Sequence, residues 1–158
     1  MDVMRRSTAI LVLTAALVAA ASASDAPAAT CGALLKLPPA AAAGEFTMYG
    51  HIKSLTRKGR RFELRFDPAL WLTGATATRA KLEDTGSGDV ANDYYVLEQG
   101  HRLLTFLVPA TAHVTVLLHG TCTTSITVAQ LAKSPRPDGF WIRVRIDTVR
   151  SLDQQYRP

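Results

Sequence analysis

The stretch RFELRF, residues 61–66, alternates charged and apolar side chains and decides the fold class. A period of two puts the apolar residues on one face of a β-strand and the charged residues on the other, as in a half-buried strand. Residues 46–55 alternate in the same way, and the polar RKGR tetrapeptide at 57–60 between the two stretches is typical of a turn. The sequence therefore predicts an antiparallel hairpin over residues 46–66.

Further short alternating stretches follow in the second half of the chain. We expect strands at 94–97, 103–108, 113–118 and 121–125. The clearest strand is predicted at 139–146, and Val149 and Leu152 indicate an antiparallel return after it.

The 139–146 stretch also predicts which side chains face the core. Ile142, Val144 and Ile146 are expected to point inward, together with the apolar residues of RFELRF. Trp141, Arg143 and Arg145 then form a row on the opposite, outward face.

Pro and Gly interrupt the predicted strands. Asp67-Pro68 is expected to end the second strand, followed by a helical turn at 69–72 and a short helix at 75–82. Residues 127–132 predict one more helical turn.

Six or seven hairpin-connected strands with one short helical insertion indicate a mainly β fold. We expect a small antiparallel barrel, OB-like, or a β-roll, with a two-sheet sandwich as the alternative.

The first 44 residues differ from the rest of the chain. Residues 1–23 are typical of a secretory signal peptide, with two arginines before an apolar run and an Ala-Ser-Ala cleavage site at 21–23. An uncleaved membrane anchor is the alternative, although the run is shorter than a bilayer span. Residues 24–44 are rich in Ala and Pro and predict a mobile arm. Residues 45–158 suffice for a single β-rich domain, with no second apolar stretch long enough to cross a membrane.

A signal peptide directs the domain out of the cytoplasm, to the periplasm, the cell envelope or the medium. Both cysteines, Cys31 and Cys122, follow the predicted cleavage site. Two thiols in an oxidising compartment usually pair, so we expect a Cys31–Cys122 disulfide. Two buried free thiols are the alternative.

Positive charge is concentrated in two places. The formal net charge is +5, which becomes +4 when Arg5, Arg6 and Asp2 leave with the signal peptide. The clustered residues are those of the predicted hairpin tip, Arg57, Lys58, Arg60 and Arg61, and of the last predicted hairpin, Arg143, Arg145 and Arg150. Trp141 shares the outward face with Arg143 and Arg145 and adds an aromatic ring to this candidate binding surface. Guanidinium groups pair well with phosphate and carboxylate.

These basic residues predict an acidic partner. Because the chain is expected to leave the cytoplasm, nucleic acid is a poor candidate. An anionic polymer of the cell envelope, a lipid surface or an acidic protein fits better. An ordinary solvated strand face is the alternative.

Three other groups of residues are weaker candidates. Asn92, Asp93, Tyr94 and Tyr95 form a second candidate binding cluster, although turn chemistry accounts for the same residues. Asp67 or Asp93 is a candidate acid for a small secreted hydrolase. The acidic loop at 84–92 lacks EF-hand spacing, and the four histidines lack metal-ligand spacing, so no metal or cofactor is expected.

Four short sequence motifs occur one after another along the chain. They are Asp-Pro-Ala-x-Trp-Leu-x-Gly at 67–74, Asn-Asp-Tyr-Tyr at 92–95, Phe-Trp-Ile-x-Val at 140–144 and Gln-Tyr-x-Pro at 155–158. In these motifs the chain resembles a family of small secreted bacterial β-rich proteins to which no activity is assigned. The resemblance covers about residues 46–158 and implies one secreted β-rich domain, with no catalytic residue.

The sequence favours binding over catalysis. The leading interpretation is an exported, non-enzymatic β-barrel domain that binds at or outside the cell envelope through its basic face. The alternatives are the small hydrolase and a protein-binding domain that inhibits a partner or stabilises the envelope.

Overall fold

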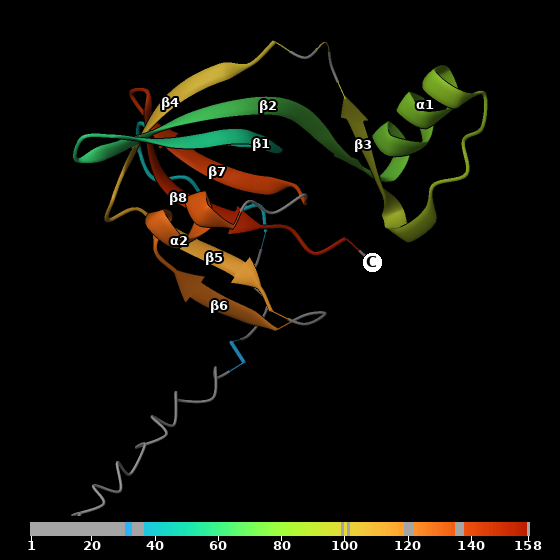
Figure 1. The fold of residues 1–158 in the computed structure, drawn as a ribbon. Helices are drawn as coiled ribbons and strands as arrows, with labels where there is room; N and C mark the ends of the chain where they lie inside the picture. Colours follow the sequence, from blue (N-terminus) through green and yellow to red (C-terminus); the bar gives the residue numbers. More distant parts are fainter. Residues whose placement is uncertain are drawn as a thin grey trace, which may run out of the picture.

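Eight strands form one sheet in the computed structural model of this chain (Figure 1). The structure describes residues 31–32, 37–98, 100, 102–118, 122–134 and 138–157. The predicted signal peptide, residues 1–23, lies outside the described residues. The strands are β1 (Phe46–Lys58), β2 (Arg61–Thr73), β3 (Tyr94–Glu98), β4 (Leu104–Pro109), β5 (His113–Leu117), β6 (Thr123–Ile126), β7 (Phe140–Arg145) and β8 (Thr148–Gln154).

Five of these strands close into a ring. β1 pairs with β2 and β7, β7 pairs with β8, and β4 pairs with both β2 and β8. All these contacts are antiparallel except that between β4 and β8, where Leu107 pairs with Thr148. A partly open five-stranded ring connected in this way is an OB-like barrel, as the sequence predicts. The remaining strands extend it: β3 continues the sheet beyond β2, and the β5–β6 hairpin continues it beyond β8.

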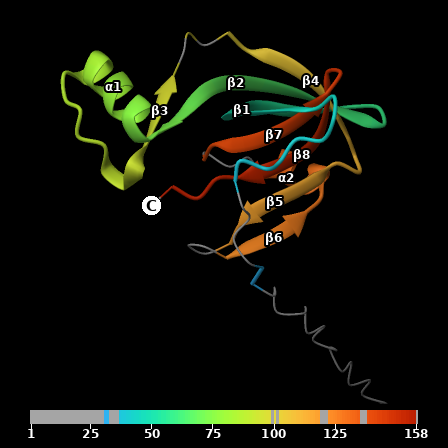
Figure 2. The same cartoon turned by 180° about the vertical axis from the view of Figure 1, so that it is seen from behind.

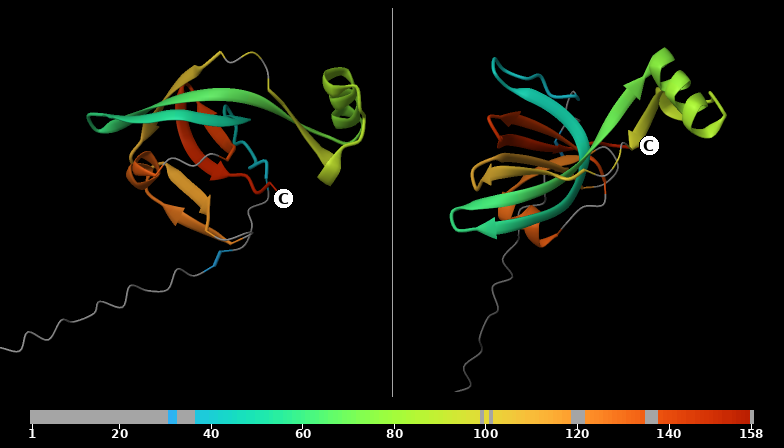
Figure 3. Two further views of the ribbon diagram at one scale, coloured as in Figure 1. Left: turned by 45° about the vertical axis from the view of Figure 1, so that its right-hand side comes forward. Right: turned by 90° about the horizontal axis from the view of Figure 1, so that it is seen from above.

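Two α-helices and a single 3-10 turn, η1 (Ala91–Asp93), accompany the strands in the described part of the chain. α1 (Gly74–Thr85) follows β2 and lies with β3 at one end of the molecule, opposite the β1–β2 turn (Figure 3). α2 (Val128–Lys133) begins where the sequence places a helical turn. The Thr127 hydroxyl accepts a hydrogen bond from the Gln130 amide at 3.2 Å, which caps this short helix. Val128 and Leu131 of α2 enter the barrel core.

The second strand does not end at Asp67-Pro68, so the helical turn predicted at 69–72 is wrong. β2 continues to Thr73, and Pro68 lies opposite Gly50 of β1. Proline is tolerated in a strand where its missing N–H is not needed by the neighbour. The extra residues of β2 carry it past the ring and allow it to pair with β3.

The core has the alternation expected from the sequence, with one exception. Phe62, Leu64, Phe66, Ile142 and Val144 are buried in a single cluster. Ile146, expected in the same cluster, is 84% exposed. The strand has already ended there, because Ile146 and Asp147 have φ of +43° and +55° and form the tight turn between β7 and β8.

The chain before β1 lies on the outer face of the sheet. Cys31 is bonded to Cys122, and Gly32 pairs with Thr123 of β6. Residues 37–45 then pass over β7 (Figure 2). There the Thr47 hydroxyl donates to the Pro39 carbonyl at 3.0 Å, and Arg143 lies 3.5 Å from a Glu45 carboxylate oxygen. Residues 24–30 and 33–36 of the predicted mobile arm lie outside the described residues.

The residues that the structure describes contain no helix that is both long and apolar enough to cross a membrane.

Candidate functional site

The ring brings the two basic hairpins onto one wall. Glu63 of β2 lies opposite Leu107 of β4, Leu107 pairs with Thr148 of β8, and Thr148 lies opposite Arg145 of β7. Neighbouring strands are about 4.8 Å apart, so Arg145 lies about 14 Å around the wall from Glu63. The sequence alone does not show that these hairpins are neighbours.

We call the outer face of β2, β4, β8 and β7, together with the β1–β2 turn, the basic wall. Its cations are exposed: Arg57, Lys58, Arg60, Arg61, Arg65, Arg145 and Arg150. Among the described residues, no ion pair involves any of these seven side chains. The same strands and turns carry four carboxylates, Glu63, Asp67, Asp147 and Asp153, of which Asp67 and Asp153 are buried. The exposed surface of the wall therefore has an excess of positive charge.

The β1–β2 turn projects from the barrel at the end opposite α1 (Figure 1). Gly59 has φ of +62°, which a two-residue turn between paired strands requires and which glycine adopts without strain. The Arg57 guanidinium donates to the Gly59 carbonyl at 3.2 Å and lies 6.0 Å from the centre of the Phe62 ring. The other turn cations extend into solvent.

Only part of the outward row predicted on β7 is accessible to a ligand. Trp141, Arg143 and Arg145 do share the face opposite Ile142 and Val144. Trp141, however, is only 9% exposed, so its ring offers no stacking surface. Arg143 is paired with Glu45 and donates to the Ala40 carbonyl at 3.4 Å. Residues 37–45 and 155–157 cover Trp141 and Arg143, which the sequence alone did not indicate. Arg145 alone remains exposed in this row.

Trp141 belongs to a second buried cluster on the outer face of the sheet. Its ring lies 5.3 Å from that of Tyr49, and Tyr49 meets Trp71 edge-on at 5.0 Å. Tyr94 stacks on Trp71 at 4.1 Å with the ring planes 9° apart. We call these four residues the aromatic cluster. The Trp141 ring nitrogen donates to the Gln155 side-chain oxygen at 2.7 Å.

The four sequence motifs meet in the aromatic cluster. Trp71, Tyr94, Trp141 and Gln155 come from the first, second, third and fourth motif respectively. Sequence reasoning did not identify Tyr49 as their common neighbour. The alternation of residues 46–55 does place Tyr49 and His51 on the same face of β1. The strand register that brings β2 and β7 next to these two residues, however, could not be predicted from the sequence.

One ion pair and one histidine–carboxylate contact lie beside the aromatic cluster. His51 Nε2 is 2.8 Å from a Glu98 carboxylate oxygen, and Lys53 Nζ is 2.9 Å from an Asp67 oxygen. Burial raises the pKa of the Tyr49 phenol, although the positive charge of Arg157 acts in the opposite direction. These contacts tie β1 to β2 and β3 and support a structural role for the cluster.

The residues proposed for the second binding cluster are spread over a turn. Asn92 and Asp93 have positive φ, +60° and +56°, which Asn and Asp tolerate better than most residues. The Tyr95 hydroxyl donates to Asp84, and Tyr94 is held by Trp71. Asn92, Tyr94 and Tyr95 line a shallow pocket of about 240 Å³ together with the C-terminal Arg157.

The two candidate hydrolase residues are far apart. Asp67 is buried in β2 and paired with Lys53. Asp93 is exposed and precedes Tyr94, which lies opposite Thr73, six residues along β2 from Asp67. That separation is about 20 Å at 3.3 Å per residue, beyond the roughly 5–10 Å that separates glycosidase carboxylates.

Within the described ranges, no three His, Cys, Asp or Glu side chains are grouped so that they could hold a metal ion. His101 and His119 lie outside those ranges.

The fold and the surface together define an OB-like barrel with a basic outer wall and one disulfide. Comparison with protein-family models, curated proteins and solved structures finds no match to the chain.

Proposed function

We propose that this chain is a non-catalytic binding domain that works outside the cytoplasm and holds an anionic polymer of the cell envelope on its basic wall. The observation that carries the proposal is the set of seven exposed cations without an ion-pair partner in the described part of the chain. They extend across two hairpins, which suits a long ligand with repeated negative charges better than a single small anion.

The position of the basic wall on the barrel supports the same conclusion. OB barrels bind oligonucleotides and oligosaccharides on the face of their second and third strands and on the loops between strands one and two and between strands four and five. Here these are β2, β4, the turn after β1 and the turn after β7. The cations occupy this same region, whereas the aromatic cluster, with Tyr49 and Trp141 buried, lies at the other ends of β2 and β7.

The disulfide supports a location outside the cytoplasm, because disulfides persist in oxidising compartments. An envelope polymer with phosphate or carboxylate groups is then a more accessible polyanion than nucleic acid. Arginine supplies three of the four wall cations at the β1–β2 turn, and its planar guanidinium suits both groups.

The test measures binding of the purified domain to three probes: long-chain inorganic polyphosphate, polygalacturonate and phosphatidylglycerol vesicles. We expect binding to at least one polymer, with an affinity that falls steeply as salt is added. Arg60→Gln with Arg61→Gln should weaken it at low salt by at least about tenfold, since each cation near an anionic surface contributes about 1 kcal/mol.

The matched control is Arg79→Gln with Lys81→Gln on α1, which removes the same charge at the other end of the molecule. We expect it to retain the wild-type affinity. An equal loss in both double variants would show attraction by net charge alone and overturn the proposal. Binding to vesicles without binding to either polymer would assign the surface to a lipid instead.

A further inference from the structure

No described strand pairs with one edge of the second half of β1. β1 pairs with β7 only from Phe46 to Gly50, whereas it pairs with β2 as far as Lys58. In the part of the chain that the structure describes, no backbone hydrogen bond reaches residues 51–58 from the β7 side. We call this stretch the open edge of β1.

The register of the hairpin shows which backbone groups the open edge presents. Lys58 and Arg61 flank a two-residue turn. In such a hairpin the pair next to the turn exchanges both hydrogen bonds, and successive pairs alternate. Leu55 and Arg57 therefore direct their N–H and C=O groups away from β2, toward the open edge.

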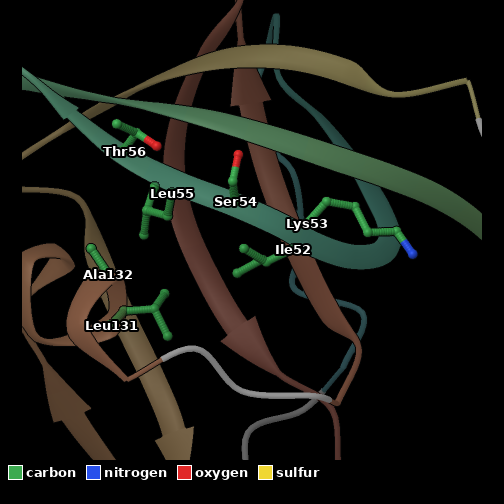
Figure 4. Close-up of a pocket in the computed structure, with 7 residues that line it drawn as sticks. All are labelled: Ile52, Lys53, Ser54, Leu55, Thr56, Leu131 and Ala132. Atoms are coloured by element: carbon green, nitrogen blue, oxygen red, sulfur yellow. The ribbon is translucent and has the colours of Figure 1, made fainter.

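A groove runs between the open edge and α2. It consists of two adjoining pockets of about 270 Å³ and 320 Å³, which share Leu55, Thr56 and Ala132. In Figure 4, Ile52 and Leu55 of β1 point toward Leu131 and Ala132 of α2 across the first pocket. Phe62 and Ala129 line the second pocket, so the groove has an apolar floor along its length.

The charged residues around the groove are all positive. Lys53, Arg57 and Lys133 line the two pockets, and neither pocket is lined by an Asp or a Glu. Lys53 is paired with Asp67, which leaves Lys133 and Arg57 to face a ligand. Arg57 also belongs to the basic wall, whereas Lys133 lies on α2 and does not. A second copy of this edge would bring cations against cations, which is a known means of preventing edge-to-edge association.

We propose that the open edge of β1 is a strand-addition site for an extended peptide that alternates apolar and acidic side chains. The peptide backbone pairs with Leu55 and Arg57, its apolar side chains occupy the two pockets, and its carboxylates face Arg57 and Lys133. Recognition of this kind takes affinity from main-chain hydrogen bonds and specificity from pockets for alternate side chains. The open edge spans eight residues, about 26 Å, which accommodates a peptide of similar length.

The first experiment uses a labelled seven-residue peptide of alternating Glu and Val, measured by fluorescence polarisation. We expect it to bind, and to slow hydrogen exchange at the amides of Leu55 and Arg57. The same peptide with Lys in place of Glu should bind at least about tenfold more weakly. A version N-methylated at every internal residue should lose binding, because it keeps the charges but cannot pair its backbone.

The second experiment changes the groove without changing the basic wall. Lys133→Glu and Ala132→Glu should each weaken binding of the Glu-Val peptide, whereas Lys81→Glu on α1 should not. Neither groove variant should change binding to the polyanion probes, so this proposal and the proposed function can fail separately. Equal binding of the N-methylated or the lysine peptide, or unchanged exchange at Leu55 and Arg57, would overturn the proposal.

Discussion

The phenol of Tyr49 occupies the space that a side chain at position 139 would need. A Cβ atom added to Gly139 would overlap the Tyr49 hydroxyl and the adjacent ring carbon. Gly139 directly precedes β7, and its carbonyl accepts a hydrogen bond from the Gln155 amide at 3.0 Å, so its backbone is fixed. Tyr49 is 2% exposed and lies at the centre of the aromatic cluster, which leaves the ring little room to move.

Gly139→Ala should therefore destabilise the domain by about 3 kcal/mol, in the upper range for overpacking of a core. Urea denaturation measures the change in the free energy of unfolding. The matched control is Gly88→Ala, whose Cβ would approach a Thr78 methyl group at 3.2 Å. That side chain is exposed and can adjust, so we expect a cost below about 1 kcal/mol. Equal costs would show that Tyr49 is not fixed.

The strand register of β7 predicts opposite responses at adjacent positions. Val144 is fully buried in the barrel core, whereas Arg145 is exposed. Val144→Asp buries a carboxylate and should cost about 4 kcal/mol, close to the whole stability of a small domain. Arg145→Asp should cost less than about 1 kcal/mol. If the two variants had the same thermal midpoint, the assignment of inner and outer faces to β7 would be wrong.

The disulfide should contribute strongly to stability. Cys31 and Cys122 are 91 residues apart, and cross-linking a loop of that size stabilises the folded state by about 4–5 kcal/mol in the chain-entropy model. Cys31→Ser with Cys122→Ser should lower the denaturation midpoint accordingly. Mass spectrometry of the purified protein, alkylated without reductant, gives an independent check. Two alkylated thiols would contradict the disulfide.

Alkaline pH should weaken the fold through Tyr49. Burial raises the pKa of its phenol above the usual 10.0, with Arg157 opposing, so the folded state holds the proton more tightly than the unfolded state. Stability from this residue is therefore present below about pH 10 and falls as the pH rises further.

Tyr49→Phe should reduce the loss of unfolding free energy between about pH 9 and about pH 11. Tyr156→Phe is the control, because it removes a half-buried phenol outside the aromatic cluster. An identical pH dependence in the wild type and the Tyr49 variant would exclude this role for the residue.

The alternation of apolar and polar residues predicted the strands correctly where one face of the strand is exposed to solvent and the other is buried. RFELRF, residues 61–66, became part of β2 with its apolar residues in the core, and the stretch before it became β1. The same rule was wrong at Ile146, because alternation does not show where a strand turns. Asp67-Pro68 was misread because local propensity favours a helix start there, whereas the pairing of β2 with β1 and β3 keeps the chain extended.

The candidate site was less accessible from the sequence. The cations of the β1–β2 turn could be found from composition and turn chemistry. Their proximity to Arg145 depends on the contact between β4 and β8, which joins residues far apart in the chain. The burial of Trp141 depends on residues 37–45 and 155–157, whose sequence has no strand periodicity to indicate where they lie.

The single backbone pair that joins β4 to β8 and closes the ring has a consequence for the order of folding. The β1–β2 and β7–β8 hairpins join neighbouring segments and need little loop closure, so they can form early. Leu107 and Thr148 are 41 residues apart, and they are the one pair that joins β4 to β8. Contacts of this range are slow to form. The pairing of β1 with β7 has a still longer range, because it joins residues 90 to 98 apart, from Gly50 with Phe140 to Phe46 with Val144. Closure of the barrel is therefore expected late in folding, and the Leu107 amide, which donates to the Asp147 carbonyl at 2.9 Å across the shorter of the two junctions, should become protected late.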